Sequence, residues 1–487
     1  MSYPLSDLEP KLLWKHFYSL TQIPRPSKKE EKIIQFMKQF GENLGLETIV
    51  DKTGNVIIRK PASPGMENRL GVVLQGHLDM VPQKNSDKTH DFENDPIETV
   101  IDGEWVKAKG TTLGSDNGLG VAAAMAVLED KTLVHGPIEA LFTIDEESGM
   151  TGAFNLEPGI LKGDILINTD SEEEGQLYIG CAGGINGNFK LSYIEESFPS
   201  DSKAFRISIS GLKGGHSGLD IALGRGNSCK IITRFLYHGI KEHRLQIASL
   251  EAGNMRNAIP REANAIVVIP SSEEKHFGDF FGKLTSAIKA ELSVTEPQLN
   301  ISLEPAARPE KVMDRKNQEI IVNAIYACPN GVIRMSDAME GLVETSTNLS
   351  IIKSQNGVVT VTCLLRSSVD SAKHDLATMM GSVFELAGAE VVFNGDYPGW
   401  KPNPLSTILK LMQEVYNRKF GRIPEIKAIH AGLECGILGA AYPNWDMISF
   451  GPTIRYPHSP DEKVNIPSVP KFYDFLVETL KNIPVKQ

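Results

Sequence analysis

Five segments of the chain carry side chains that could bind a metal ion. Each holds His, Asp or Glu directly after a short apolar run or in a Gly-rich turn. The side chains are His77, Asp79, Asp116, Glu146, Glu147, Asp170 and His458. Imidazole nitrogens and carboxylate oxygens together suit zinc, cobalt or manganese, and two His with no Cys make zinc the first choice. The residue types therefore raise the hypothesis of a metal site.

Each segment taken alone also fits an ordinary structural role. A His-x-Asp triplet is a weak signal, two adjacent Glu after a strand commonly lie in a solvated loop, and an Asp in a Gly-rich turn commonly caps a helix. A shared site is favoured because the segments recur at one kind of position, where the loops of an open α/β sheet converge on a crevice. Carboxylates crowded there would repel one another unless cations offset their charge.

The elements that would position these side chains follow an α/β pattern at both ends of the chain. Short apolar strands alternate with helices, as in a sheet that is covered on both faces. The pattern predicts strands at 70–75, 138–144, 165–168 and 446–450, and helices at 118–129, 404–420 and 469–482. In between, longer alternating strands such as 205–209 and 358–365 indicate an α+β texture.

A chain of 487 residues exceeds what one compact core usually holds, so two domains are expected. We predict an α/β domain with a mixed sheet flanked by helices, built from residues 1–184 and 400–487. Residues 185–399 would form an inserted α+β domain. Insertion explains the pattern better than a tandem arrangement, because both ends of the chain then complete one sheet.

Composition excludes several classes of function. A net charge of −11 and a pI of about 5.6 leave no basic face for nucleic acid. The first residues, MSYPLSDLEPKLLW, lack the pattern of a secretion signal, and nowhere do about 18 apolar residues run together. We therefore expect a cytoplasmic protein that binds neither nucleic acid nor a membrane.

Six motifs, spread over nearly the whole chain, resemble those of the di-zinc metallopeptidases, the family that includes glutamate carboxypeptidase, tripeptide aminopeptidase and carnosinase. The motifs lie at 77–82, 114–118, 145–149, 168–173, 214–218 and 457–462. The resemblance implies a catalytic domain that holds two metal ions and an inserted lid or dimerisation domain.

The resemblance also implies a role for each metal-site residue. Asp116 would bridge the two ions; His77 and Asp170 would complete one site, and Glu147 and His458 the other. The peptide bond after the bridging Asp is often cis in this family.

Two further residues would act beside the metal ligands. Asp79 would orient the His77 imidazole and fix its tautomer, because it lies two residues further along the same loop. Glu146 would be the general base that takes a proton from the water held between the ions and passes it to the leaving amine.

The inserted domain would supply the remaining groups. His216 resembles the family's donor to the tetrahedral oxyanion, contributed from its own chain or from the partner chain of a homodimer. Asn257 and Arg366 match positions that bind the carboxylate end of the substrate, and Gly432 matches a backbone contact to it.

The resemblance thus implies hydrolysis of small peptides. Dipeptides with a carboxyl-terminal His, such as β-alanyl-histidine, are the expected substrates, as for the aminoacyl-histidine dipeptidases of this family. Two alternatives stay open: an amidohydrolase acting on N-acyl or ureido amino acids, and a metal-dependent binding protein that has kept the fold. The sequence leaves open the side-chain preference, the physiological metal and the oligomeric state.

Overall fold

The computed structural model describes residues 4–486, and the chain divides into two compact units. The first unit comprises the chain up to Gly180, Pro402–Ala428, and the chain from Leu433 onward. The second comprises Cys181–Lys401 and Ile429–Gly432. The segment Ile429–Gly432, which the sequence placed with the catalytic domain, groups with the second unit because the Ala182 N–H lies within hydrogen-bonding distance of the carbonyls of Ile429 and Ala431.

The first unit is built on an eight-stranded mixed sheet. Its order is β1 (Glu47–Val50), β2 (Val56–Lys60), β6 (Ile138–Thr143), β3 (Val72–His77), β7 (Ile165–Asn168), β23 (Asp446–Ser449), β8 (Gln176–Cys181) and β22 (Glu425–Ile429). The central strands β6, β3, β7 and β23 run parallel, whereas β1, β2 and β8 pair antiparallel with their neighbours. Every residue of β3, β6 and β7 is buried, as their continuous apolar runs predict.

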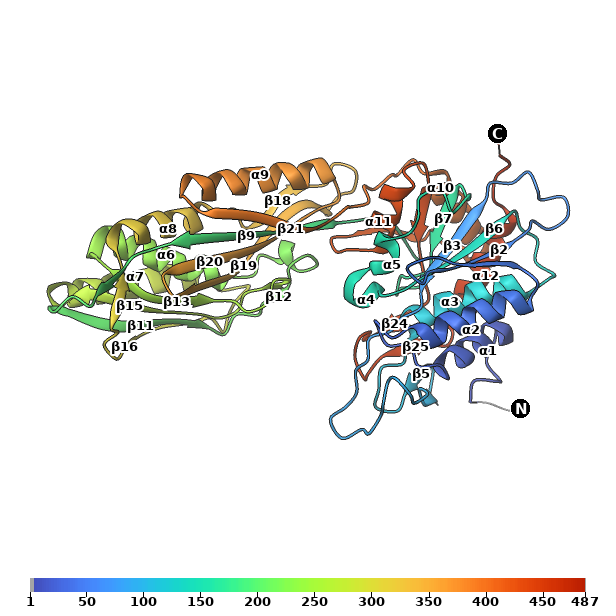
Figure 1. Ribbon diagram of the computed structural model, residues 1–487, viewed down its shortest axis with the longest axis horizontal. Helices are drawn as coiled ribbons and strands as arrows, with labels where there is room; N and C mark the ends of the chain where they lie inside the picture. The colour runs from blue at the N-terminus through green and yellow to red at the C-terminus, as the bar shows by residue number, and fades with distance from the viewer. Residues whose placement is uncertain (1–3, 487) are drawn as a thin grey trace. The chain divides into compact units, whose positions relative to one another are not determined.

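Helices cover this sheet. They are α1 (Lys11–Thr21), α2 (Glu31–Asn43), α3 (Ser115–Glu129), α4 (Glu146–Gly149), α5 (Thr151–Phe154), α10 (Thr407–Phe420), α11 (Glu434–Ala441) and α12 (Ser468–Lys481). Helix α3 packs between β3 and α1 and is buried along nearly its whole length, and Figure 1 shows it beside α1 and α2. A smaller sheet has the order β24 (Ile454–Arg455), β25 (Lys463–Asn465), β5 (Trp105–Ala108) and β4 (Thr99–Asp102).

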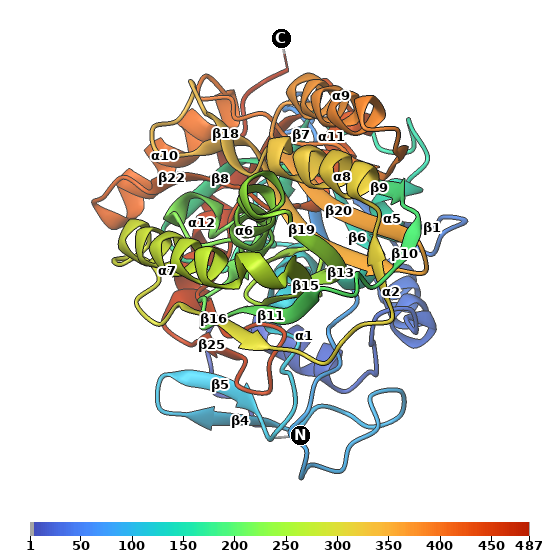
Figure 2. The same cartoon turned by 90° about the vertical axis from the view of Figure 1, so that its left-hand side faces the viewer.

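The second unit is built on a nine-stranded antiparallel sheet. Its order is β16 (Asn300–Pro305), β11 (Ser202–Ser210), β15 (Ala263–Pro270), β13 (Gln246–Ala252), β19 (Val343–Gln355), β20 (Val358–Ser367), β9 (Gly183–Ser192) and β21 (Glu390–Tyr397), with β18 (Gly331–Met335) also paired to β19. The helices α6 (Ser228–His243), α7 (Glu274–Glu291), α8 (Arg315–Ala327) and α9 (Asp370–Leu386) share one apolar core with it. Figure 2 shows α6, α7 and α8 in front of these strands.

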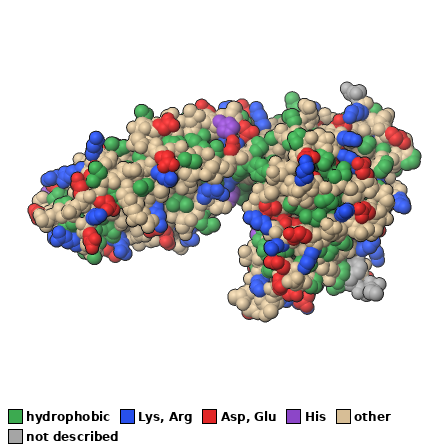
Figure 3. Space-filling model, in the orientation of Figure 1, with side chains coloured by type: hydrophobic (Ala, Val, Ile, Leu, Met, Phe, Trp, Pro, Cys, Tyr) green, Lys and Arg blue, Asp and Glu red, His purple; other side chains and the backbone are tan. Residues whose placement is uncertain are grey.

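Short elements complete the second unit. They are the strand pairs β10 (Glu195–Ser197) with β17 (Lys311–Met313) and β12 (Gly215–His216) with β14 (Ala258–Ile259), and the 3-10 turns η1 (Ile221–Leu223) and η2 (Ser271–Glu273). On the face shown in Figure 3, Lys and Arg side chains are interspersed with Asp and Glu on each unit. No helix among residues 4–486 has the length and apolar character needed to cross a membrane.

The predicted fold class is confirmed: a mixed α/β sheet flanked by helices, and an α+β remainder. Boundaries differ by a few residues. The helix predicted from residue 118 begins at Ser115, although Asp116 and Asn117 do not have helical backbone angles. The strand predicted to end at residue 75 continues to His77, because that residue still pairs with Thr143 of β6.

Candidate metal centre

The parallel strands of the first unit bring the predicted metal-site residues to one edge of the sheet. His77 is the last residue of β3, Glu146 and Glu147 follow β6, and Asp170 follows β7. Because these three strands are parallel neighbours, their following loops leave at the same edge. His458 lies further along the chain, between β24 and β25.

Asp116 lies between the two histidines. Its Oδ1 is 3.1 Å from Nε2 of His77, and its Oδ2 is 3.2 Å from Nε2 of His458. Nε2 of His77 also lies 3.3 Å from Oδ1 of Asp170, and Nε2 of His458 lies 3.0 Å from Oε2 of Glu147. The one carboxylate thus belongs to two separate groups of possible ligands.

These two groups have the spacing of metal ligands. In each, one donor atom per residue lies within 4.8 Å of the others: His77, Asp116 and Asp170 in one group, and Asp116, Glu147 and His458 in the other. Two atoms bound about 2.0–2.1 Å from a tetrahedral zinc ion lie about 3.3 Å apart, close to the separations found here. Among residues 4–486, the buried atom Glu147 Oε1 has no hydrogen-bond partner. The donor set therefore fits two divalent ions that share Asp116.

The electrostatics of the cluster also favour cations. Burial raises the pKa of Asp170 to about 8, and the neighbouring Asp116 carboxylate adds to the rise. Hydrogen bonds with Asp116 and Glu147 raise the pKa of His458 to about 11. The His458 shift reflects the negative charge of its two carboxylate neighbours, and the Asp170 shift reflects mainly burial with the Asp116 charge added. Divalent cations would offset this negative charge.

The backbone next to Asp116 has the form that the resemblance implied. The Asp116–Asn117 peptide bond is cis. The side-chain amide of Asn117 donates to the carbonyl of Thr169 at 2.8 Å. This bond ties the start of α3 to the loop that carries Asp170.

Asp79 makes more contacts than the sequence predicted. Nδ1 of His77 lies 3.1 Å from the backbone carbonyl of Asp79 and 3.4 Å from its carboxylate, so the carbonyl is the nearer acceptor. The Asp79 carboxylate accepts from the backbone N–H groups of Glu146 and Glu147, and from the Ser27 hydroxyl. Although burial alone would raise the pKa of Asp79, hydrogen bonds with His77, Ser27 and the Glu146 N–H lower it to about 2. Asp79 thus holds the backbone of both Glu residues as well as the imidazole.

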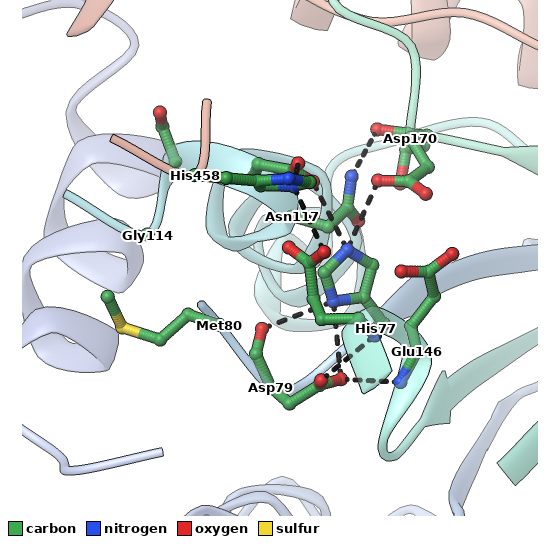
Figure 4. A network of polar contacts seen from close by, with 12 residues as sticks. His77, Asp79, Met80, Gly114, Asn117, Glu146, Asp170 and His458 are labelled. Carbon is green, nitrogen blue, oxygen red and sulfur yellow. Dashed lines mark hydrogen bonds and ion pairs between the residues drawn. The ribbon is translucent and has the colours of Figure 1, made fainter. Parts of the chain in front are cut away.

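Glu146 begins the short helix α4 and points toward Asp170 (Figure 4). Its carboxylate makes no hydrogen bond or ion pair within residues 4–486, but it lies close enough to His77 and Glu147 to form a third group of possible ligands. Burial raises the pKa of Glu146 well above its ordinary value, and the carboxylates of Asp170, Glu434 and Glu147 add to the rise. A carboxylate so placed is able to accept a proton.

The model of the Peptidase family M20/M25/M40 matches residues 73–482. The chain belongs to this family. It is therefore a peptidase, as the motifs predicted.

Two relatives of this M20 peptidase align with it along nearly the whole chain. The cytosol non-specific dipeptidase of Escherichia coli (strain K12) is 46% identical over 482 residues, which are 99% of each chain. The crystal structure of an aminoacylhistidine dipeptidase from Vibrio alginolyticus is 50% identical, covers 100% of this chain and 99% of its own, and superposes with a TM-score of 0.95. The aminopeptidase PepT of Bacillus cereus shares the fold at 16% identity, with coverage of 98% and 99% and a TM-score of 0.63.

The second unit of the M20 peptidase holds the His216 ring in one tautomer. Nδ1 of His216 accepts from the backbone N–H groups of Gly218 and Leu219, at 3.2 and 3.0 Å. The proton of the neutral imidazole therefore resides on Nε2. Burial lowers the pKa of His216, and the positive charge of Arg366 lowers it further. The neutral ring is left with one N–H to offer.

Arg366 is the next-to-last residue of β20 and is a buried cation without a counter-ion among residues 4–486. It is 5% exposed, its Nη1 donates to the Tyr397 hydroxyl at 3.1 Å, and its Nε has no hydrogen-bond partner in the described part of the chain. No carboxylate among residues 4–486 forms an ion pair with it. A buried guanidinium in this state is suited to pair with a carboxylate brought by a ligand.

The other predicted residues of the second unit lie near His216 and Arg366. A Cβ placed on Gly218 would be 3.1 Å from the His216 ring and 3.2 Å from Nε of Arg366, so both side chains border that glycine. The carbonyl of Asn257 accepts from the N–H of Ser217 at 2.9 Å. The carbonyl of His430, two residues before Gly432, also borders Gly218. The structure therefore gathers all four predicted positions in one region of the second unit.

His430 predicts a pH dependence of stability. Burial lowers the pKa of His430 to about 3, and the charges of Arg366 and His216 act in the same direction. The ring is neutral in the folded protein, whereas in the unfolded chain it takes up a proton below its ordinary pKa of 6.5. Its contribution to stability is therefore full above pH 6.5 and is lost as the pH falls from 6.5 toward 3. Urea unfolding measures the free energy of unfolding of wild type and of His430→Gln at about pH 7.5 and pH 5. Between these pH values, that free energy should fall by about 1–2 kcal/mol less in the variant than in wild type. Equal losses would contradict this assignment.

Two buried charged residues at the metal centre were not selected as site residues from the sequence. Arg25 lies between two prolines in a loop, and Glu462 ends the motif that contains His458. Both are 2% exposed and hydrogen bond to the loop that carries Asp116. For Glu462, the only sequence signal of a role at the site was its place in the motif of His458. The sequence carried no such signal for Arg25, because its partners are backbone groups far along the chain.

Proposed function

We propose that this M20 peptidase is a dipeptidase that uses two divalent metal ions, with zinc as the first choice and cobalt or manganese as alternatives. The observation that carries the proposal is the position of Asp116, whose two oxygens face Nε2 of His77 and Nε2 of His458 separately. Asp116 would be the shared ligand, His77 and Asp170 would complete one site, and Glu147 and His458 would complete the other. The first unit is the catalytic domain, and the second is the inserted lid domain.

The chain's own residues account for the proton transfers. When bound, the metal ions supply Lewis acidity toward the scissile carbonyl and toward water. Glu146, whose carboxylate has no hydrogen-bond partner within residues 4–486, takes a proton from the attacking water and delivers it to the leaving amine. Asp79 orients His77 and the backbone of Glu146. His216 donates its Nε2 proton in a hydrogen bond to the tetrahedral oxyanion.

The substrate is a small peptide with a free carboxylate at its end. Arg366 pairs with that carboxylate, since it is a buried cation that lacks a counter-ion in the described part of the chain. Asn257 and the Gly432 backbone hold the same end of the peptide. Xaa-His dipeptides such as β-alanyl-histidine are the proposed substrates. Support comes from the two relatives, of which one is named for aminoacylhistidine and the other for non-specific dipeptide hydrolysis. The name of the second also supports a cytoplasmic location.

Metal removal and substrate comparison test the proposal together. Dialysis against a chelator is expected to abolish hydrolysis of β-alanyl-histidine, and readdition of about two equivalents of zinc should restore it. The restored enzyme should be assayed on Xaa-His dipeptides, other dipeptides, and N-acetyl and ureido amino acids.

The proposal requires turnover of free-amine dipeptides above that of the blocked compounds. Faster turnover of the N-acyl or ureido compounds would replace it with the amidohydrolase alternative. A zinc-loaded protein that hydrolyses none of these compounds would contradict the enzymatic function itself.

A further inference from the structure

The carboxylate of Glu462 grips one short stretch of backbone. Its Oε2 accepts from the N–H groups of Leu113 and Gly114 at 2.8 and 2.9 Å. Its Oε1 accepts from the N–H groups of Ser115 and Asp116, at 2.7 and 3.2 Å, and from the Ser115 hydroxyl at 2.6 Å. One buried side chain thus satisfies four consecutive N–H groups, the last of which belongs to Asp116.

Arg25 binds the same stretch of backbone through the carbonyl group of Gly114. Its Nη2 donates to the carbonyl of Gly114 at 2.5 Å. Its Nη1 donates to the carbonyls of Leu78 and Asp79, at 2.8 and 3.0 Å. The guanidinium therefore joins the loop after His77 to the loop before Asp116.

Gly114 makes this arrangement sterically feasible. Its φ is +70°, and a Cβ there would lie 2.6 Å from Nη2 of Arg25 and 2.9 Å from the Met80 sulfur. A side chain at this position would displace the guanidinium. The peptide groups around Gly114 can then meet Arg25 with a carbonyl and Glu462 with N–H groups.

Arg25 and Glu462 hydrogen bond to backbone groups and do not pair with each other. No direct ion pair joins Arg25 and Glu462 within residues 4–486, although both are 2% exposed. Burying a charge is costly unless hydrogen bonds compensate it. Peptide groups provide these bonds to the carboxylate of Glu462 and to both Nη atoms of Arg25, although the Nε of Arg25 has no hydrogen-bond partner in the described part of the chain. The two residues together connect three loops, because Glu462 itself lies four residues after His458.

We propose that Arg25 and Glu462 are positioning residues that fix Asp116 between the two metal sites by joining the loops of His77, Asp116 and His458. The inference rests on the proposed function, since it assigns these loops to metal binding. Neither residue belongs to the groups of possible metal ligands found among residues 4–486. Their effect on catalysis passes through the orientation of the Asp116 carboxylate.

The test is Glu462→Gln in the full chain, loaded with Co²⁺ and observed by visible absorption. In either orientation of the new side-chain amide, its NH₂ group faces backbone N–H groups that donated to the carboxylate, so those N–H groups lose their acceptor. The cobalt spectrum, which reports ligand geometry, is expected to change, and Co²⁺ affinity measured by chelator competition should fall by about 10–100-fold, as for outer partners of metal ligands. Arg25→Lys, which replaces the planar fork by a single ammonium, should act in the same direction.

Glu139→Gln is the matched control. Glu139 is also buried in the first unit and also accepts two backbone N–H groups, from Lys162 and Gly163, but it lies near the start of β6, at the other end of that strand from Glu146. This variant should lose stability while its cobalt spectrum stays that of wild type.

The possible outcomes separate the two proposals. A wild-type cobalt spectrum and affinity in Glu462→Gln would overturn the positioning role; should that variant fail to fold, the same result in Arg25→Lys would do so. A spectral change of equal size in Glu139→Gln would show that general destabilisation alone changes the cobalt spectrum, and it would also overturn the positioning role. A wild-type protein that binds no Co²⁺ would instead refute the proposed metal centre.

Discussion

Replacement of Glu146 by Gln is expected to lower kcat for a dipeptide by about 10²–10⁴-fold, the usual contribution of general acid–base catalysis. Gln has nearly the same size as Glu but accepts no proton at neutral pH. Asp79 bonds to the backbone N–H of residue 146, and this contact does not depend on the side chain that is changed. The metal ligands also remain in place, so the variant should retain its metal content. Turnover of β-alanyl-histidine and metal content by mass spectrometry are the two measurements.

Glu157→Gln is a suitable control for that experiment, because Glu157 lies on the surface of the same unit and pairs with the exposed Lys52. It should behave as wild type in both measurements. Normal turnover by a metal-replete Glu146→Gln enzyme would remove Glu146 from the mechanism. Loss of metal together with turnover would make Glu146 a ligand instead of a base, a role that its closeness to His77 and Glu147 makes worth excluding.

Replacement of Asp116 by Asn is expected to remove both metal ions. The carboxylate offers one oxygen to each histidine group, whereas the amide has a single oxygen and would turn its NH₂ toward one of them. The loss of negative charge weakens both sites at once. Affinity for each ion should fall by at least about 100-fold. This is the largest fall usual when a residue that only hydrogen bonds to a metal ligand is replaced. Metal content after dialysis and dipeptide turnover measure the effect.

Asp170→Asn is the matched comparison for Asp116→Asn. Asp170 is placed in the His77 group alone, so this variant should lose one ion and keep the other. The distinction between two ions lost and one ion lost is specific to a shared ligand. Retention of two ions by Asp116→Asn, or equal losses in the two variants, would show that Asp116 is not shared.

The sequence by itself determined the layered α/β class and the identities of the candidate ligands. Apolar strands such as β3 and β7 are buried on both faces, and a continuous run of apolar residues in the sequence predicts this burial. His77 and Asp170 could be selected because each stands at or just beyond the end of such a run. The carboxyl ends of parallel strands meet at one edge, so their convergence followed from local pattern and topology.

Tertiary structure alone decided how these residues are held. It showed that the Asp79 carbonyl is nearer to His77 than the Asp79 carboxylate, that Ile429–Gly432 belongs with the second unit, and that Arg25 and Glu462 grip the Asp116 loop. Glu462 is separated from Asp116 by 346 residues in sequence. Hydrogen bonds to backbone groups across such a separation leave no periodicity or spacing in the chain, because every residue offers the same peptide N–H and carbonyl. Only the folded arrangement selects which of them a buried charge will meet.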